Sequence, residues 1–369
     1  MSRAFNFSAG PAALPEEVLL QIKEDLPEYK GCGSSIMEVS HRGKVYGAVH
    51  EEAIANIRKL LNLPDEYAVL LLQGGATGQF AMIPWNFLGD GQTADYVNSG
   101  AWATKAIQEA QPIGTVNVAA DIAKDIPTRM PRVSDLKLTP NAAYFHITSN
   151  ETIAGSQWQI FPESKAPLVA DMSSDILSRT IDVKQFALIY AGAQKNLGPS
   201  GVTLVIVRRD WAAKPVRKLP GMYAYATQIK ENSLFNTPPC FGIYVLVLVT
   251  RWLIQQGGVE AIQKRNQQKA AKLYAAIDAS GFYKPTAEKA YRSQMNVTFR
   301  LPSEELEEKF IQEAAARKLL ELKGHRSVGG VRASIYNAMP EAGVDALIAF
   351  MSDFQRVAQG NPGKCCSSG

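Results

Sequence analysis

Short apolar runs alternate with longer amphipathic segments through residues 1–258. Apolar runs of this length that end in glycine or polar residues are typical of buried strands, and apolar residues at every third or fourth position are typical of helices. Strands that alternate with helices favour a mainly parallel sheet with helices on both faces. The predicted strands are 67–72, 94–98, 115–119, 143–148, 166–172, 187–191 and 202–207, and the predicted helices are 16–28, 49–61, 101–110 and one that begins near Gln79.

The pattern changes after residue 258. A long helical stretch, 259–279, is followed by strand 295–300, helix 303–317, strand 331–336 and helix 344–358, which is typical of a compact α+β unit. We therefore predict an α/β protein with an N-terminal arm (1–15), a large sheet domain (16–258), a smaller C-terminal α+β domain (259–360) linked through the helix 259–279, and a disordered tail (361–369).

Composition and charge narrow the classes of function. The chain has 369 residues, of which 46% are hydrophobic and 20% charged, as is ordinary for a globular enzyme of about two domains. The formal net charge of +4 is spread out, without a basic run that would follow a nucleic-acid backbone. The longest apolar stretch, 241–254, contains Arg251 and is too short to cross a bilayer. We expect no nucleic-acid partner and no membrane segment.

The N-terminus and the cysteines indicate a compartment. The segment MSRAFNFSAGPA lacks the apolar core of a signal peptide and the Arg/Ser-rich pattern of a transit peptide, so we expect a cytoplasmic protein. Cys32, Cys240, Cys365 and Cys366 have no metal-like spacing, and the last two lie in the tail. We expect neither a disulfide framework nor a metal site.

One lysine follows a buried strand closely. The apolar run 187–191 ends at Gly192, and the small-residue loop after it carries Lys195. Burying a long charged side chain costs free energy, while the glycines of this loop leave space for a bulky ligand against the backbone. An amine held in a partly dry pocket titrates at a lower pH and becomes a nucleophile.

A carboxylate ends the preceding predicted strand. Residues 166–172 (APLVADM) place Asp171 at the carboxyl end of that strand. A lysine and an acid at the ends of adjacent strands suggest pyridoxal phosphate (PLP), with Lys195 as its Schiff-base partner and Asp171 keeping the pyridine nitrogen protonated. The alternative is a surface lysine and a helix-capping aspartate, because aspartate is common at strand ends.

Other predicted strands also end in small or polar residues. The turn 73–79 (QGGATGQ) joins a strand to a helix and could bind a phosphate through free backbone N–H groups, although its spacing is not that of a P-loop or a dinucleotide fingerprint. Trp102 follows another strand, where its indole either stacks on a flat heteroaromatic ring or packs in the core. Thr152 follows a third strand. Ligands of such sheets bind at the carboxyl ends of the strands, where these loops meet.

Two basic loops could bind anions. His41 and Arg42 lie in a glycine-bounded loop, and the segment 324–339 (GHRSVGGVRASIYNAM) supplies His325, Arg326 and Arg332. An arginine at the start of a strand can bind a carboxylate through two parallel hydrogen bonds if its side chain faces inward. The alternatives are a solvated loop pair for His41 and Arg42 and a surface salt bridge for Arg332.

Motifs along nearly the whole chain, from about residue 4 to about residue 358, resemble one family. In order, they are NFSAGPA, SHRGK, GGATGQF, SGAW, NETI, ADMSSDILSR, YAGAQKNLGPSG, NTPP and GHRSVGGVRASIYNAM. This series resembles the phosphoserine aminotransferases, which are fold-type I PLP enzymes of the class V aminotransferase group. The resemblance implies a large, mainly parallel sheet domain flanked by helices, a smaller C-terminal domain and a homodimer with shared active sites.

The resemblance also implies roles for individual residues. Lys195 would form the Schiff base, and Asp171 would pair with the pyridine nitrogen. The other cofactor contacts would be Trp102 on the ring, Thr152 on the phenolic oxygen, Ala76, Thr77 and Gln194 on the phosphate, and Asn236 and Thr237 from the partner subunit. The substrate contacts would be Arg332 on the α-carboxylate, and His325 and Arg326 with His41 and Arg42 of the neighbouring subunit on the phosphate.

The reaction that the resemblance implies is reversible transfer of an amino group from L-glutamate to 3-phosphohydroxypyruvate. Its products would be 2-oxoglutarate and O-phospho-L-serine, in serine biosynthesis, and some family members also use 4-phosphohydroxythreonine. Some members have an arginine in the glycine-rich turn where this chain has Thr77. The alternatives are an alanine–glyoxylate type aminotransferase, a cysteine desulfurase, for which Cys32 is the loop candidate, and a PLP-binding protein without catalysis.

Overall fold

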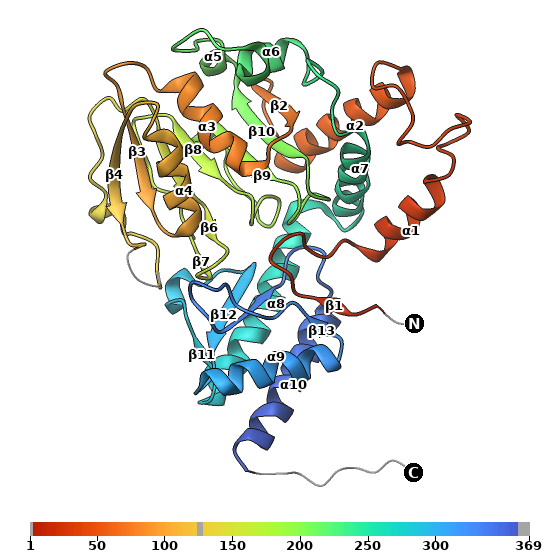
Figure 1. The fold of residues 1–369 in the computed structure, drawn as a ribbon, viewed down its shortest axis with the longest axis vertical. Helices are drawn as coiled ribbons and strands as arrows, with labels where there is room; N and C mark the ends of the chain where they lie inside the picture. Colours follow the sequence, from red (N-terminus) through yellow and green to blue (C-terminus); the bar gives the residue numbers. More distant parts are fainter. Residues whose placement is uncertain (1–2, 124–127, 361–369) are drawn as a thin grey trace.

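The computed structural model of the chain describes residues 3–123 and 128–360, and its main feature is a seven-stranded sheet (Figure 1). In spatial order, the strands are β2 (Tyr67–Leu72), β10 (Thr203–Arg208), β9 (Leu188–Gly192), β8 (Leu168–Asp171), β5 (Phe145–Thr148), β3 (Thr93–Asn98) and β4 (Thr115–Asp121). Strand β10 runs antiparallel to both of its neighbours, and the other pairs are parallel. The predicted mainly parallel sheet is confirmed.

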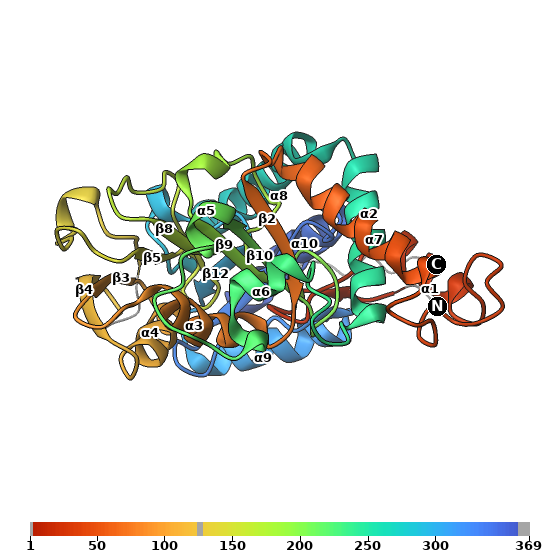
Figure 2. The same ribbon diagram turned by 90° about the horizontal axis from the view of Figure 1, so that it is seen from above.

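Helices cover both faces of this sheet (Figure 2). One face packs against α1 (Glu16–Asp25), α2 (Lys44–Leu61) and α7 (Cys240–Gln255), and the other against α3 (Gly75–Phe87), α4 (Ala101–Ala110), α5 (Arg209–Ala212) and α6 (Tyr225–Lys230). The alternation within β2 shows this division, because Val69 and Leu71 join the first core, whereas Leu70 and Leu72 join the second. Burial on both faces explains why its sequence is apolar throughout.

Four predicted helix boundaries were wrong by three residues or more, among them the start of α10 (Glu341–Ala358), which was expected at residue 344. Helix α1 ends at Asp25 rather than residue 28, because Pro27 has no N–H to donate to a carbonyl of the preceding turn. Helix α2 begins at Lys44 directly after its N-cap Gly43, so residues 44–48 are helical and not loop. Helix α3 begins at Gly75, ahead of the expected start near Gln79.

The C-terminal part has its own sheet and core. It comprises α8 (Gly258–Ser280), β11 (Lys284–Pro285), β12 (Asn296–Arg300), α9 (Glu304–Ala316), β13 (Leu319–Leu320), β14 (Val331–Ser334) and α10 (Glu341–Ala358), with β11, β12 and β14 in an antiparallel sheet. Apolar side chains of α8, α9 and α10 form a core with that sheet. This separate core supports our proposal that the chain divides into domains at 16–258 and 259–360. The predicted tail, 361–369, lies outside the described residues.

The N-terminal arm joins the two parts. Strand β1 (Phe5–Asn6) pairs in parallel with β13, and Phe7 is buried in the C-terminal core. Further along, the Ala12 N–H donates a hydrogen bond of 2.8 Å to the carbonyl of Gln194, next to Lys195. The arm therefore connects the C-terminal core with the lysine loop.

The length and the apolar character of a helix decide whether it could span a membrane. Among residues 3–123 and 128–360, no single helix is long and apolar enough to span a membrane. Helices α7 and α8 taken together meet the criteria of length and composition alone, and they are bent by 80° at the break between them.

Candidate active site

A cavity of about 140 Å³ opens where β5, β8 and β9 end and α3 and α4 begin. The predicted cofactor residues on its wall are Ala76, Thr77, Trp102, Thr152, Asp171, Gln194 and Lys195. The wall also contains Gly75 of the predicted phosphate turn and four residues that were not predicted, namely Thr148, Asn150, Ser173 and Ser174. These four lie at the last residue of a predicted strand or within two residues after it, and that position, combined with their polar side chains, is the signal that could have identified them.

Lys195 lies in the loop after β9 and is half-buried. Its Nζ donates a hydrogen bond of 2.7 Å to Thr152 Oγ1 and lies 5.7 Å from the centroid of the Trp102 ring. Burial lowers the pKa of Lys195 to about 8, a shift that Asp171 opposes and Arg332 increases. About a tenth of this amine is therefore uncharged and nucleophilic at pH 7, far more than of an ordinary lysine.

Asp171 ends β8 and is 5% exposed. Burial raises the pKa of its carboxyl group, whereas hydrogen bonds from Ser173 Oγ (2.6 Å) and Ser173 N–H (2.9 Å) favour the charged form. Both bonds are accepted by Oδ1, so Oδ2 is available to a ligand. Ser173 Oγ also accepts a bond of 3.0 Å from the Gly192 N–H, which ties the Asp171 loop to the strand that precedes Lys195.

The glycine-rich turn leads directly into α3. Gly74 and Gly75 have φ values of 93° and 63°, a left-handed conformation that glycine adopts at low cost and that lets the helix start without a longer loop. The first intrahelical bond runs from the Gly78 N–H to the Gly74 carbonyl. The N–H groups of Ala76 and Thr77 precede it and have no intrahelical partner, so this end of the cavity suits an anion.

Trp102 lies in the first turn of α4 and forms one side of the cavity. Lys105, one turn later on the same helix, is exposed and places its Nζ 4.7 Å from the centroid of the Trp102 ring. Lys105 was not predicted as a site residue. Helical spacing from Trp102 is the signal that could have found it, because residues three apart share a helix face.

The basic residues of the C-terminal part come close to this cavity. Arg332 on β14 is half-buried, and its charge lowers the pKa of Lys195. His325 Nδ1 lies 2.8 Å from Ser327 Oγ, and burial together with the charges of Arg332, Arg326 and Lys105 lowers the His325 pKa. Lys105, Arg326 and Arg332 therefore form a cationic cluster near the lysine, and the His325 imidazole lies among them.

The remaining predicted residues lie apart from this cavity in the single chain. His41 and Arg42 precede α2 in the segment that follows α1, on the side of the molecule opposite β3 and β4 (Figure 1). Asn236 and Thr237 precede α7, and the Thr237 carbonyl accepts a bond of 3.0 Å from Gln73 Nε2. None of these residues is on the cavity wall. Their expected contribution from a partner subunit stays a prediction.

Glu151, in β6 (Asn150–Glu151), is a buried acid whose role was not predicted. Its Oε1 accepts a bond of 2.7 Å from Ser99 Oγ, and burial raises its pKa to about 7. The carboxylate fills the space beside Gly100, where any side chain would collide with it. Because Gly100 is the N-cap of α4, Glu151 fixes how closely the helix that carries Trp102 approaches β6.

The geometry of the cavity fits pyridoxal phosphate. Thr148 Oγ1 lies on the wall, is buried, and has no hydrogen-bond partner among the described residues. The wall thus combines an amine, a carboxylate with a free oxygen, an indole ring and helix-terminal N–H groups, which match the aldehyde, ring nitrogen, ring face and phosphate of that cofactor.

A family model for class V aminotransferases matches residues 4–347. The phosphoserine aminotransferase of Geobacillus kaustophilus is 56% identical over 96% of this chain and 99% of its own length, and that of Bacillus subtilis is 51% identical with the same coverages. The chain belongs to the phosphoserine aminotransferase family. The resemblance in the motifs is confirmed, and with it a PLP-dependent aminotransferase.

Solved structures of this family have the same fold. The phosphoserine aminotransferase of Bacillus circulans subsp. alkalophilus superposes with a TM-score of 0.94 at 54% identity, covering 96% of this chain and 99% of that one. A PLP-bound phosphoserine aminotransferase from Trichomonas vaginalis superposes with a TM-score of 0.92 at 41% identity, covering 95% and 100%. Both the predicted fold class and the predicted cofactor are confirmed.

Proposed function

We propose that this chain reversibly transfers the amino group of L-glutamate to 3-phosphohydroxypyruvate, forming O-phospho-L-serine and 2-oxoglutarate in the biosynthesis of L-serine. The observation that carries the proposal is the position of the cationic cluster (Lys105, Arg326 and Arg332), with the His325 imidazole among its members, beside the low-pKa amine of Lys195. A substrate with both a carboxylate and a phosphate needs cationic contacts of this kind, because charge-assisted bonds bind both groups. 4-Phosphohydroxythreonine is a candidate second substrate.

Lys195 and Asp171 are the catalytic residues in this proposal. Bound pyridoxal phosphate supplies an electron-withdrawing ring that stabilises negative charge at the substrate α-carbon. Asp171 would hold a proton on the ring nitrogen, which would keep the ring electron-poor. Lys195 Nζ would take the proton from the substrate α-carbon and deliver it to the cofactor carbon that receives the amino group, and Thr152 Oγ1 accepts a hydrogen bond that positions this amine in the cavity.

The other cofactor and substrate contacts follow from the cavity wall. Ala76, Thr77 and Gln194 bind the cofactor phosphate, and Trp102 covers the ring. Arg332 binds the substrate α-carboxylate, since it is half-buried and its Nε has no partner among the described residues. His325 and Arg326 bind the substrate phosphate. Thr77 supplies no charge to this phosphate, so binding depends on the basic loops.

We also propose a cytoplasmic homodimer in which each active site uses both subunits. Leu20, Met37 and Phe235 are 60%, 62% and 47% exposed, and they lie on α1 and on the segments that precede α2 and α7. An interface on these segments would cover these apolar side chains. The same segments carry His41, Arg42, Asn236 and Thr237, so a partner that binds there would receive these residues.

Steady-state transamination tests the proposed reaction. With L-glutamate as donor, we expect turnover of 3-phosphohydroxypyruvate and little turnover of pyruvate or glyoxylate, which lack the phosphate. Equal rates with phosphorylated and unphosphorylated acceptors would favour an alanine–glyoxylate type activity. Binding of pyridoxal phosphate without turnover of any acceptor would favour a non-catalytic protein.

Mixing subunits tests the shared site. Arg42→Ala should weaken binding of the phosphorylated substrate, measured as its KM, far more than that of glutamate. Arg42→Ala and Lys195→Ala homodimers should each be impaired, but unfolding and refolding them together should restore about a quarter of wild-type activity, because half of the dimers then carry one intact site. If mixing restores no activity, Arg42 acts within its own subunit.

A further inference from the structure

Buried asparagines from different parts of the chain meet at one turn. Residues 176–178 follow β8 and Asp171, and Leu177 among them has a φ of 57°, which is unfavourable for a leucine. Consecutive carbonyls of this turn accept bonds from three different asparagine side chains: Ile176 from Asn196 (3.2 Å), Leu177 from Asn337 (3.0 Å) and Ser178 from Asn266 (3.1 Å). We call Asn196, Asn266 and Asn337 the asparagine triad.

The members of the triad also bond to one another. The Asn337 N–H donates a bond of 3.1 Å to Asn196 Oδ1, and Asn266 Nδ2 donates one of 2.8 Å to Asn337 Oδ1. Their exposed fractions are 5%, 0% and 3% for Asn196, Asn266 and Asn337. Bonds between buried amides strengthen one another and tolerate little displacement, since a lost bond leaves a buried polar group unpaired. Asn337 is the centre of this network.

Lys269 holds the backbone on both sides of Asn337. It lies one turn after Asn266 on α8, and its Nζ donates bonds of 2.9, 2.7 and 3.0 Å to the carbonyls of Ile335, Tyr336 and Met339. The segment 335–339 continues the chain directly beyond β14, which carries Arg332. The triad therefore joins the chain segments on which Asp171, Lys195 and Arg332 lie.

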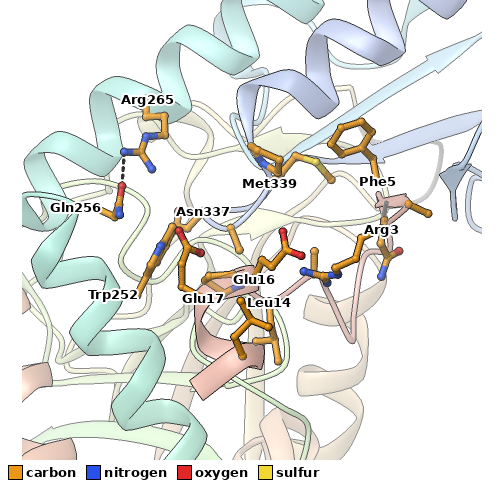
Figure 3. A pocket seen from close by; sticks show the side chains of 17 residues that line it. Arg3, Phe5, Leu14, Glu16, Glu17, Trp252, Gln256, Arg265, Asn337 and Met339 are labelled. Atoms are coloured by element: carbon orange, nitrogen blue, oxygen red, sulfur yellow. Dashed lines mark hydrogen bonds between the residues drawn. The ribbon is translucent and has the colours of Figure 1, made fainter. Parts of the chain in front are cut away.

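Apolar packing holds only part of this segment, because Ile335 and Met339 belong to the C-terminal core. On its other side lies a cavity of about 690 Å³, between the N-terminal arm, the first turn of α1 and the corner of α7 and α8. Figure 3 shows Asn337 and Met339 among the residues that line it, together with Trp252 and Glu17. On the cavity side, the hydrogen bonds from the triad and from Lys269 therefore add to the packing of Met339 in fixing residues 337–340.

We propose that the asparagine triad is a positioning unit that holds the loops of Asp171 and Lys195 in register with the segment that follows Arg332. The inference rests on the roles proposed above for these three residues. Asn196 is the neighbour of Lys195 in the chain, and the turn 176–178 is continuous with Asp171. A displacement of about 1 Å at reacting groups is enough to lower a rate about a hundredfold.

Asn337→Ala tests the positioning unit, because Asn337 is the centre of the asparagine triad. It removes the bonds to Leu177 and Asn266 but keeps the backbone bond to Asn196. In the holoenzyme, the visible absorbance of the bound cofactor changes with pH. We expect the midpoint of that titration to differ from the wild-type midpoint by about half a pH unit or more. We also expect kcat to fall about tenfold, with a smaller change in KM for glutamate.

Asn86→Ala is the matched control. Asn86 is 1% exposed and bonds to Met82, Tyr223 and Tyr225 at the end of α3 remote from the glycine-rich turn. This variant should lose thermal stability to a similar extent without a shift of the spectroscopic midpoint. An unshifted midpoint in Asn337→Ala, at a stability loss equal to that of Asn86→Ala, would make Asn337 a structural residue only and overturn the inference.

Asn337→Leu guards against misfolding of the alanine variant. It has nearly the shape of asparagine and adds no charge, but it loses both the donor to the Leu177 carbonyl and the acceptor for Asn266 Nδ2, so the same shift is expected without a large cavity. A wild-type midpoint in Asn337→Leu would overturn the inference. If wild-type protein itself shows no visible band with pyridoxal phosphate, the proposed function fails, and the inference fails with it for that separate reason.

Discussion

Burial lowers the pKa of both Lys195 and Lys269, to about 8 and about 7, but the two lysines have different surroundings. Lys269 is fully buried, and its Nζ is bonded to backbone carbonyls on three sides. Those acceptors match the three N–H groups of an ammonium ion and leave no free position on the nitrogen. Within the part of the chain that the structure describes, Lys195 Nζ donates one hydrogen bond, to Thr152, and it faces a cavity beside Asp171.

A low pKa therefore does not by itself identify a reactive amine. Lys269 is buried away from water, but its bonds to three backbone carbonyls leave no position on its Nζ for a ligand. Lys195 combines withdrawal with open space and a neighbouring carboxylate, and this combination is what a cofactor site needs. The comparison predicts that Lys195 controls the chemistry of the site and that Lys269 controls the stability of the fold.

Lys195→Ala should have the largest effect. Loss of the amine removes both the covalent attachment of the cofactor and the group that moves the proton, so kcat should fall by about a thousandfold or more. The variant should still bind pyridoxal phosphate through the remaining wall of the cavity. Steady-state transamination and absorbance measure the two properties.

Borohydride reduction of the wild-type holoenzyme provides the control. Peptide mass spectrometry should find the reduced cofactor on Lys195 and none on Lys269. Reduced cofactor on Lys269 or on another lysine would show that Lys195 is not the amine that binds the cofactor. Retained turnover in Lys195→Ala would likewise contradict its role.

Lys269→Ala should mainly lower stability. The carbonyls of Ile335, Tyr336 and Met339 lose their shared donor, and buried acceptors without partners should reduce the free energy of unfolding by about 3 kcal/mol. Denaturant titration measures this loss. Lys272→Ala, on the exposed face of the same helix, is the matched control and should have little effect, because its partners Glu341 and Asp345 are surface groups. Equal losses in the two variants would show that the buried bonds of Lys269 are not stabilising.

The sequence predicted Lys195 and not Lys269 for a physical reason. Lys195 follows an apolar run directly and is surrounded by glycines, so its unusual position is visible locally. Lys269 lies in an ordinary amphipathic segment near Lys264 and Lys272, and nothing local separates the three. Its partners lie at 335–339, far along the chain, and such contacts arise only when α8 packs against the segment after β14.

The same contrast applies to the rest of the fold and site. Buried strands and strand-end residues such as Asp171 and Trp102 were predictable because apolar runs and the residues after them are local signals. Glu151 was missed because its closeness to Ser99 and Gly100 depends on tertiary packing. His41 was predicted to bind an anion from its glycine-bounded loop and to belong to the partner's site from the family motifs, and the single chain holds it apart from the cavity.

The pH dependence has the smallest effect but separates the two lysines most directly. In the cofactor-free protein, both folded-state pKa values lie below the ordinary lysine value of 10.5, so the unfolded chain binds more protons between about pH 8 and 10.5. Both lysines therefore make the free energy of unfolding rise with pH over that range, and stability cannot distinguish them.

The rate of cofactor capture can distinguish them, because only an uncharged amine attacks the aldehyde of pyridoxal phosphate. Stopped-flow absorbance should show a rate that increases about tenfold per pH unit below pH 8 and levels off above it, as the Lys195 pKa of about 8 requires. Lys269→Met should leave this midpoint unchanged while flattening the pH dependence of stability. A capture midpoint near 10.5 would mean that Lys195 is solvated like an ordinary surface lysine, and the difference in surroundings would then not control reactivity.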